Sequence, residues 1–564
     1  MAIEPNTNIK VYHNVPLDLD QERSIAWANI SEQNAYFHTV PSSILKYNFA
    51  RTTYQRVREG VMRVEQTADN LYDCNYLAFQ NTNYGNKWFY AFITSVEYIN
   101  DITTEITFVL DDLQTWYFEM VLQPCIIERC HTTTDVIGDH IEPEPVTLGE
   151  YVMNYRKNGQ GQVLESYAPL YGMSDLAVII AIVDVSTSVS GKLYDNIYGS
   201  ATLWAFEQTN VAGINQKIAE YLLKPESIIS MYMCPHSFIS SQLFPETGYE
   251  IPSRSMVNGI IASASTLTTS AKIDGYTPRN KKLYTYPYNY YHIDNSMGSS
   301  LALRYEFFEG LSPRFEINGT ITQPVECTIR PYNYKNCTAD ARTGVFQETL
   351  NTEVLTITTF PMCSWNTDGF QAYMVQNGIP YGINAIGSGL DSFANAGLNV
   401  ALAAASGGGG AEGVTNYLSD PKQGASRLKG LAGSINIGKK TAEFATMMYK
   451  ASTASDISRG NFSNASVDCA CGRHQFYGGR CSITAEYARI IDDFFDKYGY
   501  TSMRLATPNL RARPHWTYIK TRGCAMKGSL PATSKKNIQS YFDSGITFWK
   551  TASEVGDYTL DNTV

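Results

Sequence analysis

The chain has 564 residues, of which 44% are hydrophobic and only 17% are charged, and its formal net charge is −10. This apolar content excludes a disordered chain, and the acidic balance excludes a protein that grips nucleic acid through a basic surface. A wall along which DNA slides without being held stays compatible with this charge. The low charge and the 39 tyrosines favour a chain that buries much of its outer surface against copies of itself.

The N-terminal sequence indicates where the chain is made. Its first twenty residues lack the basic and apolar regions of a signal peptide, so we expect synthesis in a cytoplasm without export by the usual route. The sequence contains no run of eighteen apolar residues, and therefore no standard membrane-spanning helix is expected.

The first third of the chain is predicted to be β. Residues 87–99 are rich in aromatic and β-branched side chains, and Asn100-Asp101 is a turn signal. Alternation then places Ile106, Phe108 and Leu110 on one face of a second strand, so that a hairpin with one buried face is expected.

The middle of the chain is also predicted to be rich in strands, from about residue 135 to residue 381. Strong strand candidates are residues 176–185 and 353–360, and residues 214–224 have the pattern of a helix.

At Ile383 the composition changes to Gly, Ala, Ser and Asn, and this persists to about residue 466. On a helix, Asn384, Ser388, Asp391 and two further asparagines form one polar stripe, opposite an apolar and small-residue face. Gly407 to Gly410 then provide a hinge or flexible linker.

A basic stretch follows this segment. Residues 421–442 contain five cationic side chains and no acid, and they are Lys422, Arg427, Lys429, Lys439 and Lys440. Such charge beside amphipathic segments favours an anionic lipid surface, at about 1 kcal/mol per residue. From the residues alone, a buried helical hairpin, a membrane-active or channel-plugging segment and a plain linker all remain open.

The chain contains eleven cysteines, which favours buried or free thiols in a reducing compartment. Cys469, Cys471, His474 and Cys481 form one local cluster, but its spacing departs from the paired C-x2-C pattern of zinc sites. Metal, a local disulfide and a turn with free thiols all stay open for this cluster, and we assign no metal and no cofactor.

The C-terminal part is again regular. Ile483, Tyr487, Ile490, Ile491, Phe494, Phe495 and Tyr498 recur at helical spacing. Ser482 is the expected cap at the start of this helix and Gly499 its expected end. A strand in residues 515–521, a short helix near residues 535–543 and a last strand ending at Trp549 are expected after it.

Catalytic patterns are weak in this sequence. Paired carboxylates occur at Asp111-Asp112, which is expected to be a turn, and at Asp492-Asp493, which is expected on the solvated face of the helix. No nucleophile–histidine spacing stands out, and the zinc-protease motif H-E-x-x-H is absent from the sequence. We therefore assign no catalytic residue and expect no enzyme.

Three stretches carry a family resemblance. They are NTNYGNKWFYAFITSVEY with TFVLDDLQTW, then FFDKYGYTSMRLATPNLRARPHWTYIKTRGC, and finally FDSGITFWKTASEVGDYT. Their order and distances resemble the distal tail-tube, or tail-knob, protein of the small short-tailed phages that infect Gram-positive bacteria. The resemblance covers the first third and the last sixth of the chain.

This resemblance implies a homohexameric, mainly β tube at the virion tail tip, attached to a proximal tail or collar protein. Viral DNA leaves through its lumen without its sequence being read. Six apolar loops plug the tube and then form a pore in the host membrane. In this sequence the implied membrane-active residues are Ile383, Ile386, Leu390, Phe393, Leu398, Val400, Leu402 and Phe444.

The sequence therefore predicts a mainly β (α+β) fold with tube or barrel domains, a central β knob and a long Gly/Ala-rich insertion. The predicted boundaries are a tube domain in residues 1–135, a knob in 136–381, the membrane-active loop in 382–465, and a segment in 466–564 that returns to the tube. A receptor-binding tail adhesin and a tail-tip cell-wall hydrolase are the alternative functions.

Overall fold

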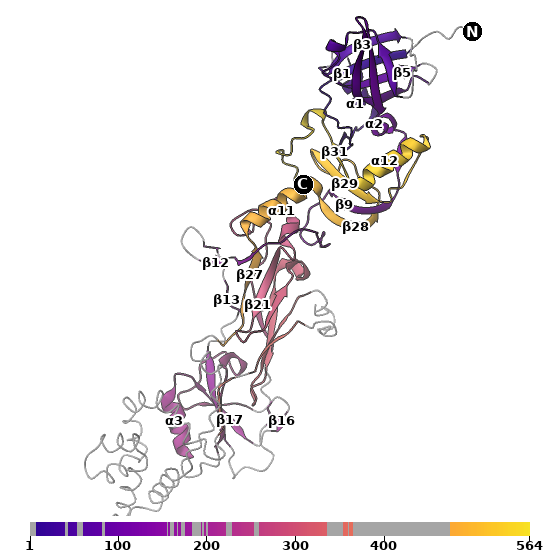
Figure 1. The fold of residues 1–564 in the computed structure, drawn as a ribbon. Helices are drawn as coiled ribbons and strands as arrows, with labels where there is room; N and C mark the ends of the chain where they lie inside the picture. The colour runs from indigo at the N-terminus through magenta and orange to yellow at the C-terminus, as the bar shows by residue number, and fades with distance from the viewer. Residues whose placement is uncertain are drawn as a thin grey trace, which may run out of the picture. The chain divides into compact units, whose positions relative to one another are not determined.

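The structure is a computed structural model, shown in Figure 1. It describes residues 7–39, 43–52, 60–81, 85–154, 156–157, 163–165, 167–170, 175–182, 193–194, 197–198, 201–221, 228–252, 259–334, 353–358, 360–364 and 474–564. The chain divides into two compact units. Unit 1 combines residues 1–152, 269–289 and 482–564, and unit 2 combines residues 153–268 and 290–481. Sheets dominate both units, so the prediction of a mainly β fold is confirmed.

The first sheet of unit 1 is six-stranded and is built mainly from neighbours in the sequence. Its order is β3-β1-β5-β6-β7-β4. The strands are β1 Thr7–His13, β3 Leu45–Thr52, β4 Val61–Val64, β5 Cys74–Asn81, β6 Trp88–Asn100 and β7 Thr103–Leu110. Short helices accompany it, at α1 Ile30–His38, η1 Ala68–Asn70 and α2 Asp112–Trp116.

The β6–β7 hairpin lies where the sequence predicted it. Ile106 and Phe108 are buried, while Leu110 is only partly buried. The turn is stabilised by the Asn100 side chain, whose Oδ1 accepts the Ile102 N–H at 3.0 Å. Alternating apolar residues and a turn-forming Asn therefore suffice to define this element.

The second sheet of unit 1 joins strands from both ends of the chain. Its order is β2-β31-β29-β9-β28. The strands are β2 Arg23–Ile25, β9 Cys125–Cys130, β28 Tyr500–Ala506, β29 Trp516–Arg522 and β31 Ile546–Trp549. A two-stranded pair continues beside it, formed by β8 Met120–Leu122 and β30 Met526–Gly528. Figure 1 shows violet β9 beside yellow β29 and β28.

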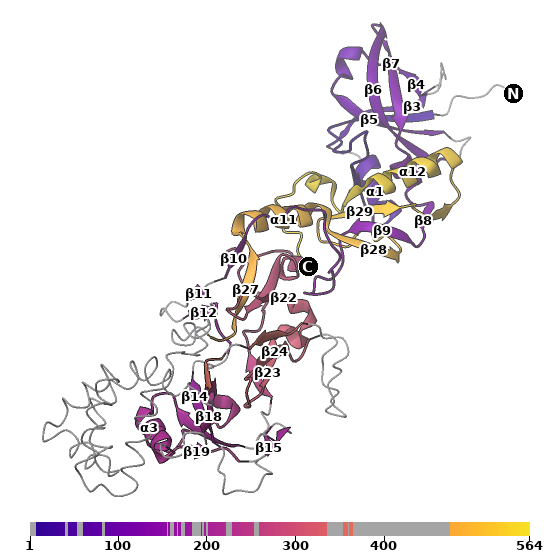
Figure 2. The ribbon, with the colours of Figure 1, turned by 60° about the horizontal axis from the view of Figure 1, so that its bottom comes forward.

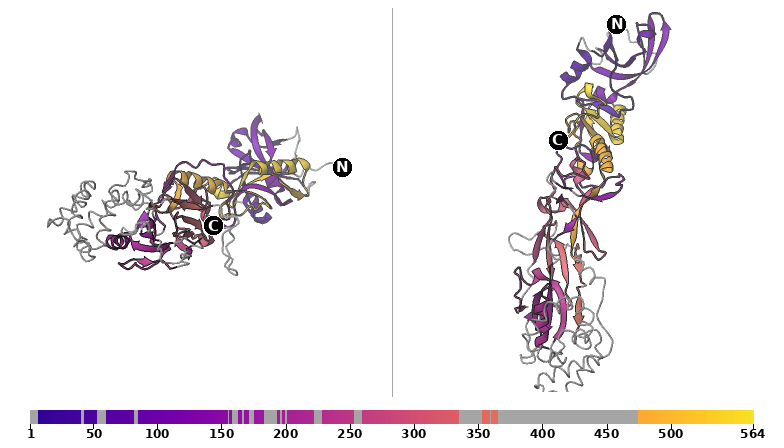
Figure 3. Two further views of the ribbon diagram at one scale, coloured as in Figure 1. Left: turned by 90° about the horizontal axis from the view of Figure 1, so that it is seen from below. Right: turned by 90° about the vertical axis from the view of Figure 1, so that its left-hand side faces the viewer.

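Helix α12, Ala532–Ser544, packs against β29. Figure 3 shows the yellow C-terminal helices beside violet strands from the N-terminal part of unit 1. Ile538 and Phe542 of this helix are fully buried in a core shared with Tyr12, Phe37 and Phe548. This core therefore joins residues from positions 12–130 with residues from positions 519–548.

The terminal strand β31 has all four of its side chains buried, and it pairs with β2 on one side and β29 on the other. Ile546, Phe548 and Trp549 are therefore enclosed by their own chain.

Helix α11, Ala485–Tyr498, is present as predicted, with two differences. Ser482 belongs to β27 instead of capping the helix, and the Ala485 N–H donates to the Asp274 carboxylate at 3.0 Å. Ile490 is exposed while Asp492 and Asp496 are buried, so the buried face is rotated from the predicted one. Gly499 ends the helix as predicted, with φ +66, and a Cβ there would lie 2.3 Å from the Cys130 carbonyl oxygen.

Unit 2 has two well-formed sheets of its own. One has the order β19-β17-β14-β18-β26 and the other the order β20-β23-β24-β25. The strands of the first are β14 Leu176–Ile182, β17 Thr202–Glu207, β18 Ile228–Pro235, β19 Tyr249–Glu250 and β26 Met362–Ser364. Those of the second are β20 Ile260–Ser263, β23 Arg314–Gly319, β24 Cys327–Pro331 and β25 Leu355–Ile357.

The predicted strands and helix of this region are confirmed, although the helix begins at Val211, before its predicted start at Ile214. Every residue of β14 is buried, as a continuous apolar run predicts for a central strand. Helix α3, Val211–Glu220, covers part of this sheet through Ile214 and Ile218.

The remaining strands form a further sheet and two short pairs. The sheet contains β10 Tyr151–Met153, β13 Ala168–Pro169, β21 Asn289–Asp294, β22 Ser300–Leu303 and β27 Tyr477–Ile483. The pairs are β11 Arg156–Lys157 with β12 Val163–Glu165, and β15 Leu193–Tyr194 with β16 Ile197–Tyr198. Single 3₁₀ turns lie at His236–Phe238, Lys281–Tyr284, Tyr305–Phe307, Glu309–Leu311 and Ala552–Glu554.

Candidate functional site in unit 1

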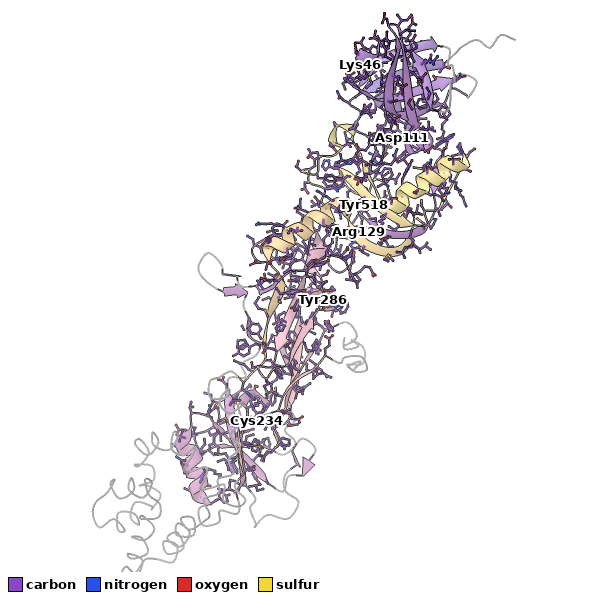
Figure 4. The ribbon with its side chains drawn as sticks, viewed as in Figure 1. Lys46, Asp111, Arg129, Cys234, Tyr286 and Tyr518 are labelled. Atoms are coloured by element: carbon purple, nitrogen blue, oxygen red, sulfur yellow. The ribbon has the colours of Figure 1, made fainter. Side chains whose placement is uncertain are left out.

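A buried ion-pair cluster fastens three distant segments of unit 1. The Glu144 carboxylate is fully buried and pairs with both Arg129 and Lys282. It also accepts the Thr501 N–H and hydroxyl, each at 2.8 Å. The Arg129 guanidinium donates in addition to the Gly499 carbonyl at 2.7 Å, so β9, β28 and residues 269–289 meet at one carboxylate. Figure 4 shows where Arg129 and Tyr518 lie, on β9 and β29 of this sheet.

Burial lowers the pKa of Lys282, and the neighbouring Glu144 opposes that shift. A buried charge is tolerated only when it is paired and hydrogen-bonded, and every oxygen of Glu144 has such partners. The cluster therefore stabilises the fold, and its charged groups are all paired with one another.

A second polar cluster surrounds Asp492 on α11. Its carboxylate accepts the backbone N–H groups of Arg279 and Asn280 at 2.8 and 3.0 Å, and the Tyr276 hydroxyl at 2.7 Å. Asp492 is 0% exposed, so the prediction that the Asp492-Asp493 pair lies on a solvated face is wrong for Asp492. It holds for Asp493, whose side chain is exposed and pairs with Arg279 at 2.5 Å.

The next acid on this helix face is Asp496, which also pairs with Arg279, at 3.3 Å. Burial raises the pKa of Asp496 to about 6, while the Arg279 charge acts in the opposite direction. One arginine thus serves several carboxylates, and it fixes residues 269–289 against α11.

Asp111 and Asp112 are structural too. Asp111 is the N-cap of α2, since its Oδ1 accepts the Gln114 N–H at 3.0 Å, and its other oxygen accepts the Tyr76 hydroxyl at 2.9 Å. Burial raises the pKa of Asp111 to about 6. Asp112 accepts from the Asn537 side chain at 2.7 Å. The predicted turn is thus the start of a short helix, and neither acid faces a nucleophile or a histidine.

The cysteine cluster falls partly outside the described residues, where Cys469 and Cys471 lie. Cys481 is a buried free thiol, and His474 is buried. Within the part of the chain that the structure describes, no group of three His, Cys, Asp or Glu side chains is arranged to hold a metal ion.

All thirteen residues predicted to act at a membrane lie outside the described residues, so they stay predictions. They are Ile383, Ile386, Leu390, Phe393, Leu398, Val400, Leu402 and Phe444, with Lys422, Arg427, Lys429, Lys439 and Lys440. Among the helices that the structure does describe, none has the length and apolar content needed to span a bilayer.

The exposed apolar side chains of unit 1 include two groups. The tip of the β6–β7 hairpin presents Tyr98, Ile99 and Ile102, and the edge of the five-stranded sheet presents Ile126, Met503 and Leu505. Solvent-facing aromatic and aliphatic side chains in groups indicate surfaces that other molecules cover.

Comparison with known proteins identifies what kind of molecule carries these features. The family model described as the C-terminal domain of the tail knob protein gp9 of Bacillus phage phi29 matches residues 256–563, more than half of the chain. The chain belongs to the tail knob protein family.

Further comparisons agree with this membership in the tail knob family. The family model of the caudoviral major tail protein N-terminus matches residues 5–121, which contain the six-stranded sheet. The tail knob proteins gp9 of Bacillus phages B103 and phi29 are 26% and 25% identical to this chain, over the full length of both partners.

The solved structure of the bacteriophage C1 tail knob protein gp12 has the same fold. It is 14% identical and aligns with a TM-score of 0.59 over 99% of each chain. The chain is thus a tail knob protein of short-tailed phages and a component of the virion tail, as its sequence resemblance implied.

The sequence reading missed the two buried polar clusters and both exposed apolar groups. The clusters carry no local signal, because Glu144, Lys282 and Thr501 are more than a hundred residues apart in sequence. The sheet edge did carry one, since in CIIERC the alternation that buries Cys125 and Ile127 turns Ile126 outward.

Proposed function

We propose that this tail knob protein forms the distal channel through which phage DNA leaves the tail. Copies of the chain assemble into a ring, a hexamer by the family resemblance, joined to a proximal tail or collar protein. Residues 382–465 of each copy plug the lumen. On contact with the host membrane these loops leave the lumen and penetrate the bilayer.

Two observations together support the proposal. The chain matches tail knob proteins over its full length, and residues 382–465 combine small residues with an apolar helix face. Building the sheets of a tail knob protein does not require a Gly/Ala-rich segment with one apolar face, so this segment has another role in the proposal. The apolar residues of such a segment cluster when they plug a channel and are buried again in lipid, each for about 1.5–3 kcal/mol. The basic residues from Lys422 to Lys440 favour an anionic leaflet.

DNA passes through such a channel without being read. The net charge of −10 fits a lumen that does not hold phosphates, because each cationic contact adds a salt-dependent grip. This proposal requires an acidic or neutral inner wall in the assembled ring, and a cryo-EM map with a strongly basic lumen would contradict it.

The decisive experiment replaces Ile386, Leu390 and Phe393 together by Ser or Asn in the phage. Virions should assemble and adsorb, but DNA delivery and the release of dye from anionic vesicles should both be lost. The control is Leu243→Ser in unit 2, where an 84% exposed side chain is removed and infection should continue. Normal infection by the triple variant would refute the loop proposal, and loss of adsorption would favour the receptor-binding alternative.

A further inference from the structure

Two exposed surfaces of unit 1 are complementary in charge and similar in apolar content. The hairpin tip consists of Glu97, Tyr98, Ile99, Asp101 and Ile102, at the turn between β6 and β7. Strand β5 pairs only with Trp88–Phe92, so the second half of β6 extends beyond it, as Figure 2 shows for the long β6–β7 ribbon.

The hairpin tip is apolar and acidic. Tyr98 is 59% exposed and Ile102 66% exposed, although the Tyr98 hydroxyl donates to the Asp101 carboxylate at 2.6 Å. Arg63 on the neighbouring strand β4 is paired with Glu105 at 2.9 Å. The carboxylates of Glu97 and Asp101 therefore set the charge of this tip.

The second surface is the edge of the five-stranded sheet and is apolar and basic. Its members are Ile126, Met503, Leu505, Lys520 and Arg522. Leu505 pairs with Ile126 across β28 and β9, and Ile126 pairs with Arg522 across β9 and β29, so these three share one row and one face. Leu505 is 72% exposed, and the side chain of Arg522 is 67% exposed.

Arg522 pairs with Glu128 at 3.9 Å, and Glu128 also pairs with Lys520 at 2.9 Å, so two cations share one carboxylate. Arg504 pairs with Ile127 and interacts with the Cys130 thiol, on the other face of the sheet, so it adds no charge to this row. The sheet edge thus retains positive charge around its apolar row.

Strand β28 is an outer strand of its sheet, with a pairing irregularity between Thr501 and Arg504 and a positive φ at Met503. A bulge of this kind protects an edge from gaining an extra strand. Binding at this edge therefore uses side chains, and a compact hairpin turn suits it better than an extended peptide does.

We propose that the hairpin tip of one copy docks on the sheet edge of the next copy of this chain. A second copy is the fitting partner because both surfaces have similar apolar content and opposite charge and belong to the same unit. Two different surfaces that fit one another produce head-to-tail association, which closes into a ring when the rotation per copy permits. The inference rests on the proposed self-assembly and names the surfaces that perform it.

The test reverses charge on each surface of the full-length chain. One variant carries Glu97→Lys with Asp101→Lys, and the other carries Lys520→Glu with Arg522→Glu. In sedimentation velocity each variant alone should need at least tenfold more protein than the unmodified chain to assemble. An equimolar mixture should assemble at the original concentration, because each reversed tip then meets a reversed edge.

Two controls separate this contact from folding and from net charge. Lys535→Glu with Lys536→Glu on α12 changes the net charge by the same amount as the sheet-edge variant and should assemble normally. Thermal unfolding of both surface variants should be near that of the unmodified chain, and recovery on mixing excludes misfolding as the cause.

Each outcome decides the matter. If either surface variant assembles at the original concentration, or if the mixture does not recover, the docking contact is wrong while the proposed ring survives. If the unmodified chain is a monomer at every concentration and in virion extracts, the proposed self-assembly fails, and the docking contact fails with it.

Discussion

The two sheets of unit 1 differ in how far apart their strands lie in the sequence. The six-stranded sheet is made from residues 7–110, and its central hairpins join consecutive strands. The five-stranded sheet collects strands from residues 23–25, 125–130 and 500–549. Local pairing makes the first sheet readable from the sequence, while the second depends on contacts that close loops of hundreds of residues.

This difference assigns separate roles to the two sheets. The chain leaves unit 1 near residue 152 and returns to it at residues 269–289 and again from residue 482. The five-stranded sheet and the Glu144 cluster are where the returning segments are fastened. The six-stranded sheet takes no strand from the returning segments, although its Tyr12, Tyr76 and Tyr90 share a core with them.

The largest expected effect on stability follows from removing Glu144, the carboxylate at the centre of the buried ion-pair cluster. Glu144→Ala leaves Arg129 and Lys282 buried without their carboxylate, and we expect a loss of about 3–5 kcal/mol in the free energy of unfolding. Chemical denaturation of the full-length chain measures this. Glu128→Ala is the matched control, because its exposed pairs with Lys520 and Arg522 should contribute less than about 1 kcal/mol. Equal losses of stability from the two changes would mean that the buried Glu144 cluster stabilises the fold no more than an exposed ion pair does.

A smaller effect is expected where the two sheets meet, at Asp111. Its pKa is raised by burial to about 6, from a usual value of 3.8, so the folded chain retains a proton that the unfolded chain loses. The stability contributed by the protonated carboxyl is fully present below pH 4 and is lost as the pH rises through 6.

Asp111→Asn keeps the helix cap but removes this titration. We expect the variant to gain about 2–3 kcal/mol over the unmodified chain between pH 4 and pH 7, at about 1.4 kcal/mol per pKa unit. Denaturation across this pH range is the measurement. Because Asp496 titrates in the same range, Asp496→Asn is the companion variant, and parallel pH profiles for Asp111→Asn and the unmodified chain would refute the assignment.

The smallest effect belongs to the local sheet. Asn100→Ala removes the side-chain acceptor of the Ile102 N–H at the hairpin turn, an exposed hydrogen bond worth about 0.5–1.5 kcal/mol. Hydrogen exchange should quicken at the turn and stay unchanged in β29 and β31. Faster exchange throughout the five-stranded sheet would show that opening of the hairpin turn also destabilises the second sheet.

The sequence by itself determined the elements whose signals are local. The β6–β7 hairpin, the all-buried strand β14, helix α11 with its end at Gly499, and the order β29, α12 and β31 all follow from side-chain periodicity and turn residues. Membership of the tail knob family was equally visible, because aromatic blocks such as YGNKWFYAF keep their order along the chain. The predicted domain boundaries and the membrane-active loop stay predictions.

Only the tertiary structure decided which polar residues are buried. Asp492 looks like a surface acid on its helix, and it is enclosed because the backbone of residues 279–280 supplies two N–H donors from more than two hundred residues away. In the same way, β31 looks like a strand available to a neighbour, and its own chain covers it through β2 and β29. Side-chain periodicity specifies one face of a helix or strand. The segment that covers this face is determined by contacts between residues distant in sequence. Those contacts also determine whether a charged side chain is solvated or is buried and paired.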